Sequence, residues 1–338
     1  LEKKLLHPEN IILRKKSCCE AGSIARLTFQ TKRNSRVVKI RRNTISGLKA
    51  LPLLIILGFL LGSTMVVSRF AIKQFDALTY VALRFVLASM VNICIYIIVP
   101  GLKLPSDIRV WAKAALVGLV GTALTFTAYI KSLNYLSSGV VSVLVTLTPV
   151  VTFILAQVFL KDEPLSPRKM IGAVVAFIGA GVLFVFKETG LPDITQPDLR
   201  GYAWVFLGLV GNAWGLVIIK RSLKTETAFT VASIRSFSTT LVLIPLTLLS
   251  KGFNFSGVRA SGFGSLLYAA IFGTCGSIFL YSYITKRFGA SMASQTEYIT
   301  PVFASALGAI FLAERITLIM GSGVLLIFVG IRIIGRMK

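Results

Sequence analysis

The chain has little of what catalytic and metal-binding proteins use. Its 338 residues include one histidine, His7, and four cysteines, none with Cys-x-x-Cys spacing. Such a set predicts neither a metal site nor a disulfide framework. The sequence also lacks a Gly-Lys dipeptide, which excludes a phosphate-binding P-loop within this chain. We therefore predict a protein that is not an enzyme and that has no metal site and no cofactor.

Charged residues are also scarce, at 15%, whereas hydrophobic residues make up 55% and the mean hydropathy is +0.79. Runs of about 20 apolar residues match a lipid core ~30 Å thick. Ten such runs follow one another, with short loops between them: 50–70, 77–99, 111–131, 138–160, 169–186, 202–219, 228–249, 263–285, 289–312 and 316–334. The sequence predicts an all-α polytopic membrane protein with ten transmembrane helices in the lipid bilayer.

Acidic residues number 13 against 37 lysines and arginines, and the net charge is +24. Thirteen of the basic residues precede the first run. If that end is inside, the later inner segments hold 14 basic residues and the outer segments hold eight. This bias is the positive-inside pattern, which predicts that both termini are cytoplasmic. It accounts for the charge without a nucleic-acid partner.

Residues 1–47 form a basic tail with only Glu2, Glu9 and Glu20 as acids. It has no apolar run of signal-peptide length. Three interpretations stay open: a disordered cytoplasmic tail, an organellar transit peptide, or an over-extended or truncated start of the sequence. The third is supported by the position of the first methionine, Met65. We take the disordered tail as the working prediction.

The apolar part contains an internal repeat. At a shift of 152 positions, GTALTFTAY (121–129) aligns with GTCGSIFLY (273–281), and Thr-Pro-Val at 148–150 aligns with 300–302. At a shift of 151, Arg84 aligns with Arg235. The repeats cover 48–187 and 202–336, with five predicted helices each. Because five is odd, the second repeat must enter the membrane from the opposite face. Inverted repeats of this kind are typical of secondary transporters.

Motifs in both halves carry a family resemblance: LLGSTMVVSRFAIK at 60–73, TLTPVVTFILAQVFLKDEPLSPRKMIG at 146–172, NAWGLVIIK at 212–220 and YITPVFASALGAIFLAERIT at 298–317. They resemble the EamA type of the drug/metabolite transporter superfamily, although Leu61 replaces a tryptophan common there. The resemblance implies an exporter or permease of small metabolites such as amino acids, in the cell membrane. A homodimer is compatible with it. The alternatives are a non-transporting scaffold or receptor and a membrane-embedded enzyme.

Polar residues recur at equivalent positions of the third and eighth, and of the fourth and ninth, predicted helices. As a set they are predicted to line a midplane cavity that opens to each side in turn, and the alternative for each is a role in helix packing. The set comprises Thr122, Thr125, Tyr129, Ser142 and Thr146 with Thr274, Ser277, Tyr281, Ser294 and Tyr298. The small-residue faces of the fifth and tenth helices, around Gly179 and Gly323, are attributed to close helix packing instead.

Three ionisable residues lie within predicted spans and are assigned to the same cavity: Arg84, Arg235 and Glu297. An arginine at the membrane centre costs about 2.5–3.5 kcal/mol on insertion scales, so each must face protein, water or headgroups. Arg235 and Glu297 lie at similar depth, which favours an ion pair between them. That pair would leave Arg84 to attract an anionic group, and Glu297 to bind a cation or a proton. Alternatively, the arginines extend to the interface, or Glu297 is unpaired and keeps its proton.

Pro149 and Pro301 occupy equivalent positions of the fourth and ninth predicted helices. Proline removes the hydrogen bond to the carbonyl four residues earlier, here those of Val145 and Glu297. We therefore predict that both helices bend beside the cavity.

Overall fold

The computed structural model describes residues 50–99, 102, 104–105, 107–159, 167–192, 198–222, 227–250, 252–288 and 295–335. Every regular element within these ranges is helical. Residues 1–52 and 53–338 form separate units. The predicted basic tail, residues 1–47, lies outside the described residues.

Within the described residues, seven helices are long and apolar enough to cross a membrane. They are Ala50–Ala71, Ala77–Ile98, Ile108–Ser132, Ser138–Gln157, Arg200–Ile219, Phe229–Ser250 and Ala260–Tyr281. Three shorter apolar helices, Met170–Val185, Thr296–Leu312 and Leu318–Ile334, fall on the remaining predicted runs. The chain is thus a polytopic membrane protein built from helices, as the hydropathy predicts.

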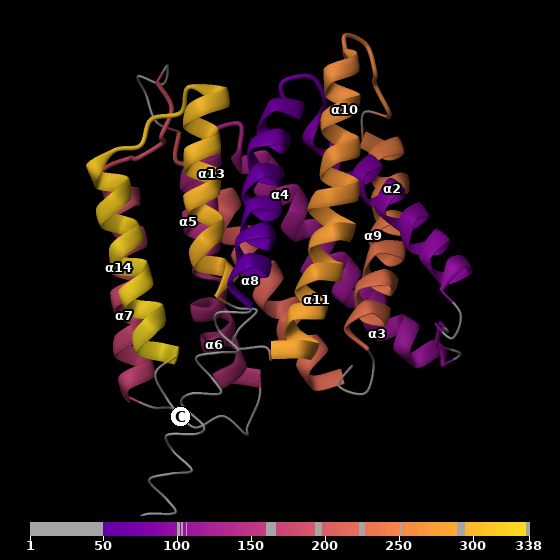
Figure 1. The fold of residues 1–338 in the computed structure, drawn as a ribbon, viewed down its shortest axis with the longest axis horizontal. Helices are drawn as coiled ribbons and strands as arrows, with labels where there is room; N and C mark the ends of the chain where they lie inside the picture. Colours follow the sequence, from indigo (N-terminus) through magenta and orange to yellow (C-terminus); the bar gives the residue numbers. More distant parts are fainter. Residues whose placement is uncertain are drawn as a thin grey trace, which may run out of the picture. The chain divides into compact units, whose positions relative to one another are not determined.

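Beyond the first helix, which ends at Ala71, the elements follow the order shown in Figure 1: α2 (Ala77–Ile98), α3 (Ile108–Gly118), η1 (Leu119–Leu124), α4 (Thr125–Ser132), α5 (Ser138–Val145), α6 (Thr148–Phe159), α7 (Pro167–Val185), α8 (Arg200–Ser222), α9 (Ala228–Ser250), α10 (Ala260–Tyr268), η2 (Ala269–Gly276), α11 (Ser277–Phe288), α13 (Thr296–Leu312) and α14 (Leu318–Gly335). Asp76 and Ser137 cap the starts of α2 and α5 with side-chain oxygens.

The third and eighth spans each contain a π-helical segment, η1 and η2, at equivalent places of the two repeats. A π-helix adds a residue to the turn and often marks a functional site. Hydroxyl groups bond to the carbonyls five residues earlier: Thr122 to Val117 at 3.3 Å, and Thr274 to Ala269 at 3.1 Å. Threonines at these positions therefore support the widened turns. Sequence periodicity did not predict these segments.

The helix of the fourth span is interrupted just before Pro149. α5 ends at Val145 and α6 begins at Thr148. The Thr148 hydroxyl donates to the Val145 carbonyl at 2.7 Å, which is the group that the proline leaves unpaired. α13, in contrast, continues through Pro301. The helix is therefore interrupted beside Pro149 but continuous at Pro301, and a bend at each proline stays a prediction.

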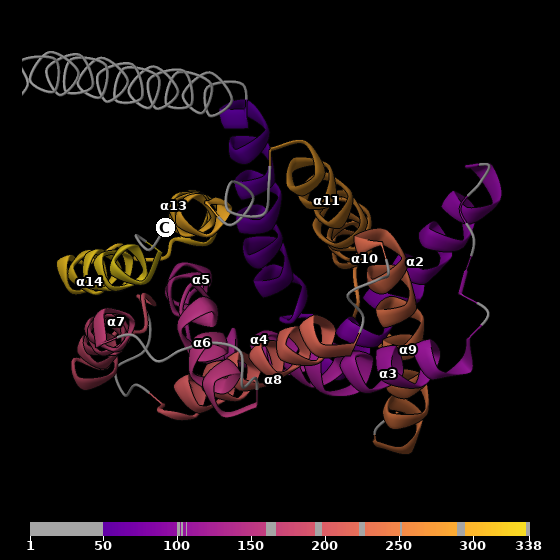
Figure 2. The same ribbon diagram turned by 90° about the horizontal axis from the view of Figure 1, so that it is seen from below.

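Helices of the two repeats pack against each other at the centre of the bundle. α2 lies beside α9, and the Ser89 and Thr240 hydroxyls, 151 positions apart, are joined by a 3.0 Å hydrogen bond. The first helix, indigo in Figures 1 and 2, lies between α13 and the α10–α11 segment. η1 touches α8 so closely that a Cβ on Gly121 would lie 2.6 Å from the Gly215 Cα. These contacts place spans of both repeats around one central volume.

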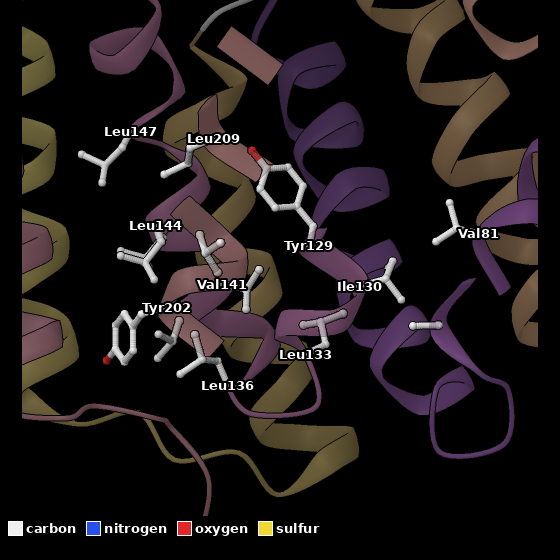
Figure 3. Packing of buried hydrophobic residues seen from close by; sticks show 14 of the residues in the cluster. Val81, Tyr129, Ile130, Leu133, Leu136, Val141, Leu144, Leu147, Tyr202 and Leu209 are labelled. Atoms are coloured by element: carbon white, nitrogen blue, oxygen red, sulfur yellow. The ribbon is translucent and has the colours of Figure 1, made fainter. Parts of the chain in front are cut away.

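The apolar core extends through the same central region. Tyr129, Ile130 and Leu133 of the third span pack with Val141 and Leu144 of α5 (Figure 3). Burial of such side chains from water contributes about 1.5–3 kcal/mol each in a soluble protein. Between lipid-facing helices the gain comes from close packing instead. The core therefore fixes the third and fourth spans, which carry much of the candidate site.

α7 and α14 lie side by side at one edge of the bundle (Figures 1 and 2) and meet through glycines. A Cβ on Gly179 would lie 2.8 Å from the carbonyl oxygen of Gly323, and one on Gly172 would lie 2.7 Å from that of Gly330. These are the small-residue faces that the sequence assigned to helix packing, and that prediction is confirmed.

Alanine substitutions on α7 test this packing. Gly179→Ala is expected to destabilise the protein by about 1–3 kcal/mol, because the new methyl group forces the α14 backbone away. Gly181→Ala is the matched control on the same helix, since its Cβ would meet nothing within 4 Å. Alanine favours a helix over glycine, so this variant is expected to be as stable as the wild type or more so. Thermal unfolding in detergent measures both, and equal midpoints would contradict the packing account.

Candidate functional site

A cavity of about 410 Å³ lies among the first helix, α2, η1, α4, α5, α8, α9, η2, α11 and α13. This size is within the range of small-molecule sites. Nine of the predicted site residues line it: Arg84, Thr122, Thr125, Tyr129, Arg235, Thr274, Ser277, Tyr281 and Glu297. Equivalent elements of both repeats thus contribute equivalent side chains to one cavity.

Two predicted site residues are directed elsewhere. The hydroxyls of Ser142 and Thr146 are buried and donate to carbonyls of their own helix, those of Gly139 at 2.7 Å and Val143 at 2.6 Å. Serine and threonine inside helices often satisfy their hydroxyls in this way. These two residues are not among those that line the cavity, and a role for them in a transport site stays a prediction.

Tyr298 is also absent from the cavity wall. Its ring packs edge-on against Phe328 of α14, with centroids 4.9 Å apart, so it joins neighbouring helices. Ser294 lies outside the described residues. Of the predicted residues on the ninth span, Glu297 is therefore the one that the structure brings to the cavity.

Several lining residues were not in the predicted set. Asn212 belongs to the NAWG motif, and its polar character inside an apolar span was the available signal. The apolar lining includes Phe85 and Phe126, whose rings meet edge to face at 5.1 Å between centroids. Nothing in their sequence pattern separates these rings from ordinary core residues.

The two arginines form matching contacts that cross between the repeats. Arg84 on α2 donates through Nε to the Thr274 hydroxyl of η2 at 2.9 Å. Arg235 on α9 donates through Nε to the Thr122 hydroxyl of η1 at 3.0 Å. Each arginine therefore contacts the π-helical segment of the other repeat. The arginines face protein and the cavity, as their cost in lipid requires.

The environments of the two arginines differ beyond that contact. Arg235 also donates through Nη2 to the Gly121 carbonyl, at 3.3 Å. Arg84 is 3% exposed, and its guanidinium carbon lies 5.3 Å from the centre of the Phe126 ring. A cation over an aromatic face is stabilised by the ring's quadrupole.

The predicted ion pair between Glu297 and Arg235 is not formed. The ion pairs among the described residues are Arg69–Glu314 and Arg200–Asp198. Arg235 instead contacts η1, because the widened turn presents the Thr122 hydroxyl and the Gly121 carbonyl to it. Glu297 lies partly buried near Tyr129 and Tyr281, with which it interacts electrostatically. Arg235 and Glu297 lie at similar depth along their helices, but their side chains do not form an ion pair.

The Tyr129 hydroxyl is buried without a hydrogen-bond partner among the described residues. Thr148 and Asn212 lie nearby, but neither has hydrogen-bond geometry to it. A buried donor left unpaired costs about 1–3 kcal/mol. Tyr129 belongs to the cavity lining, although this oxygen atom itself has almost no accessible surface.

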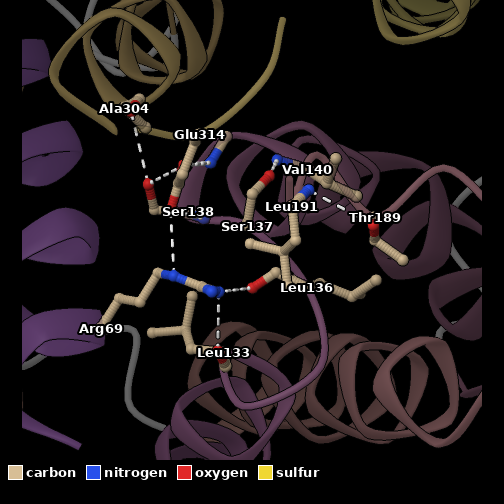
Figure 4. A network of polar contacts seen from close by, with 11 residues as sticks. Arg69, Leu133, Leu136, Ser137, Ser138, Val140, Thr189, Leu191, Ala304 and Glu314 are labelled. Carbon is tan, nitrogen blue, oxygen red and sulfur yellow. Dashed lines mark hydrogen bonds and ion pairs between the residues drawn. The ribbon is translucent and has the colours of Figure 1, made fainter. Parts of the chain in front are cut away.

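A second polar cluster joins the first helix to two loops at one end of the bundle (Figure 4). Glu314 accepts hydrogen bonds from the Ser138 amide at 2.9 Å and the Ser138 hydroxyl at 2.7 Å. Arg69 lies 3.2 Å from Glu314, measured from Nε to Oε1, and donates to the Leu133 and Leu136 carbonyls. Glu314 thus caps the start of α5 and pairs with Arg69. Its repeat equivalent, Glu163, lies outside the described residues.

A family model for EamA-like transporters matches residues 48–185 and again 199–336. The chain belongs to the EamA-like transporter family. An uncharacterized transporter of Archaeoglobus fulgidus is 26% identical over 272 residues, which cover 80% of this chain and 92% of that protein. The uncharacterized transporter YyaM of Bacillus subtilis is 27% identical, over 74% of this chain and 82% of that one.

Further comparisons support the same class. The uncharacterized inner membrane transporter YedA of Escherichia coli is 25% identical to this EamA-like transporter, over 73% of this chain and 78% of YedA. A solved crystal structure matches with a TM-score of 0.59 and 18% identity, covering 84% of this chain and 95% of the other. At that identity the structure shows a shared fold alone. Together with the apolar helices, the family match makes this chain an integral membrane transporter.

Proposed function

We propose that this EamA-like transporter is a secondary-active exporter or permease of small metabolites such as amino acids. It works by alternating access around the central cavity. The observation that carries the proposal is the pair of arginine–threonine contacts, Arg84 to Thr274 and Arg235 to Thr122, which relate the repeats at the cavity wall. A site between two such repeats can be exposed to either face when one rocks against the other.

The proposal includes ten transmembrane helices in two inverted five-helix repeats, 48–187 and 202–336. The seven long and three shorter apolar helices support this count, and the matching π-helical segments support the repeat relation. The distribution of basic residues supports cytoplasmic termini in the cell membrane. A non-transporting scaffold or receptor would not need a polar cavity shared by both repeats.

Uptake into everted membrane vesicles tests the proposed function. Radiolabelled amino acids and nucleosides are offered to vesicles with the transporter and to vesicles from cells without it. At least one solute is expected to accumulate only where the transporter is present. Accumulation should depend on an ion gradient rather than on ATP, because the chain has no P-loop. Correctly inserted protein that moves no solute in either direction would contradict the proposal.

A further inference from the structure

Few charged side chains line the cavity, and they differ in how many of their polar atoms have a hydrogen-bond or ion-pair partner. The charged lining residues within the described part of the chain are Arg84, Arg235 and Glu297, and neither arginine is paired with a carboxylate. Glu297 lines the same cavity but forms an ion pair with neither arginine. Two guanidinium groups without an ion-pair partner among the described residues therefore face a cavity whose other lining residues are Glu297 and apolar or neutral polar side chains.

Arg84 has the most unused hydrogen-bonding capacity. A guanidinium group has five N–H donors, and Nε–H of Arg84 is the donor with a protein partner, the Thr274 hydroxyl. Its two terminal amino groups have none among the described residues, although the side chain is only 3% exposed. A charge so buried is costly unless a ligand of opposite sign completes its shell.

The contact with Thr274 also sets how an anion can approach. Because Nε–H is occupied, a ligand must meet the outer edge of the guanidinium, where Nη1 and Nη2 point in parallel. A carboxylate matches that edge with two hydrogen bonds. Arg235 is less available, since Nε and Nη2 are both held by η1. The two equivalent arginines thus differ in their capacity to bind a ligand.

The surface around Arg84 is apolar. Phe126 lies under its guanidinium, Phe85 meets Phe126 edge to face, and Leu61 and Met65 line the same cavity. This part of the wall accommodates an aromatic or branched apolar body beside the guanidinium group.

We infer that the cavity binds an organic anion with an apolar body, whose carboxylate is held by the terminal amino groups of Arg84. This assignment rests on the proposed function, in which the same cavity is the transport site. Arg235 mainly positions η1 and contributes less to ligand affinity.

Isothermal titration calorimetry of the purified transporter in detergent tests the inference with three compounds that share a phenylpropyl body and differ in the end group. These are 3-phenylpropanoate, 3-phenylpropan-1-ol and 3-phenylpropylamine. The carboxylate is expected to bind about tenfold or more tightly than the alcohol, as expected for hydrogen bonds to a charged group. The amine is expected to bind most weakly. If the alcohol or the amine matches the carboxylate, the inference is overturned.

Four variants locate the interaction. Arg84→Gln is expected to weaken binding of the carboxylate about tenfold or more and to leave binding of the alcohol unchanged. Arg84→Lys keeps the charge without the double contact, so its loss should be smaller. Arg235→Gln is expected to lose less affinity than Arg84→Gln. Arg109→Gln removes an exposed charge that does not line the cavity and is the control for net charge.

Size-exclusion profiles and thermal midpoints must first show that each variant is folded. If Arg84→Gln does not fold, the comparison of Arg84→Lys with the wild type decides instead. Unchanged carboxylate affinity in a folded Arg84 variant, or equal losses at Arg84 and Arg235, would overturn the assignment. Vesicle transport is measured separately. Binding at Arg84 without transport would count against the proposed function, whereas transport without a carboxylate preference would count against this inference alone.

Discussion

Replacing Glu314 with alanine is expected to destabilise the transporter by about 3–5 kcal/mol, the usual cost of removing one partner of a buried ion pair. The side chains of Arg69 and Glu314 are only 13% and 4% exposed. Without Glu314, Arg69 keeps its carbonyl contacts but loses its counter-charge, and the Ser138 amide at the start of α5 loses its acceptor. Thermal or denaturant unfolding in detergent measures the loss.

The exposed Arg200–Asp198 pair provides the matched control. Its side chains are 73% and 31% exposed, and solvent screens such pairs strongly. Its carboxylate also accepts the Arg200 amide at the start of α8, at 2.9 Å, so Asp198→Ala is expected to lower the unfolding midpoint slightly, and far less than Glu314→Ala does. A combined Arg69→Met and Glu314→Leu variant removes both charges and should recover part of the loss of Glu314→Ala. Similar midpoints for Glu314→Ala and Asp198→Ala would contradict the structural role of the Glu314 cluster.

Replacing Glu297 with glutamine is expected to abolish the pH dependence of transport. Glu297 lines the cavity without an ion-pair partner, in a span where an isolated carboxylate is costly. If it binds and releases a proton in each transport cycle, the rate must follow the proton concentration on the two sides. Glutamine keeps the shape and the hydrogen-bonding groups but cannot carry the proton. Transport rates in vesicles over a range of pH measure the effect.

Asp198→Asn controls for the loss of a carboxylate elsewhere, since Asp198 is exposed in the loop before α8. Its pH profile should match that of the wild type. A wild-type pH dependence in Glu297→Gln would rule out proton transfer by this residue. Unchanged rates at every pH would leave Glu297 a structural residue.

The sequence predicted the helices and the repeat because both depend on local pattern. Apolar runs located the spans, and the alignment of Arg84 with Arg235 and of Thr122 with Thr274 identified residues that the structure brings into the cavity. Their pairing across the repeats was not predictable, because sequence position does not say which helices become neighbours. The π-helical turns, which shift the hydroxyls toward the arginines, have no simple sequence signal.

The differences between prediction and structure have physical reasons as well. Depth along a helix suggested that Arg235 and Glu297 pair, but depth says nothing about the direction in which a side chain points around its helix. Ser142 and Thr146 have polar groups at the expected level, yet their own backbone carbonyls satisfy those groups. Glu314 appeared only as a repeat match, and its role as a cap on α5 depended on a loop contact distant in sequence.

Two-sided accessibility of one cavity residue tests alternating access most directly. Ser277 lines the cavity and is 4% exposed, so Ser277→Cys, made after removal of the native cysteines, reports on the cavity alone. A membrane-impermeant maleimide is applied to right-side-out and to everted vesicles. Alternating access predicts that Ser277→Cys is labelled from both faces. In each case 3-phenylpropanoate is expected to slow the labelling. Labelling from only one face under every condition would contradict alternating access through this cavity.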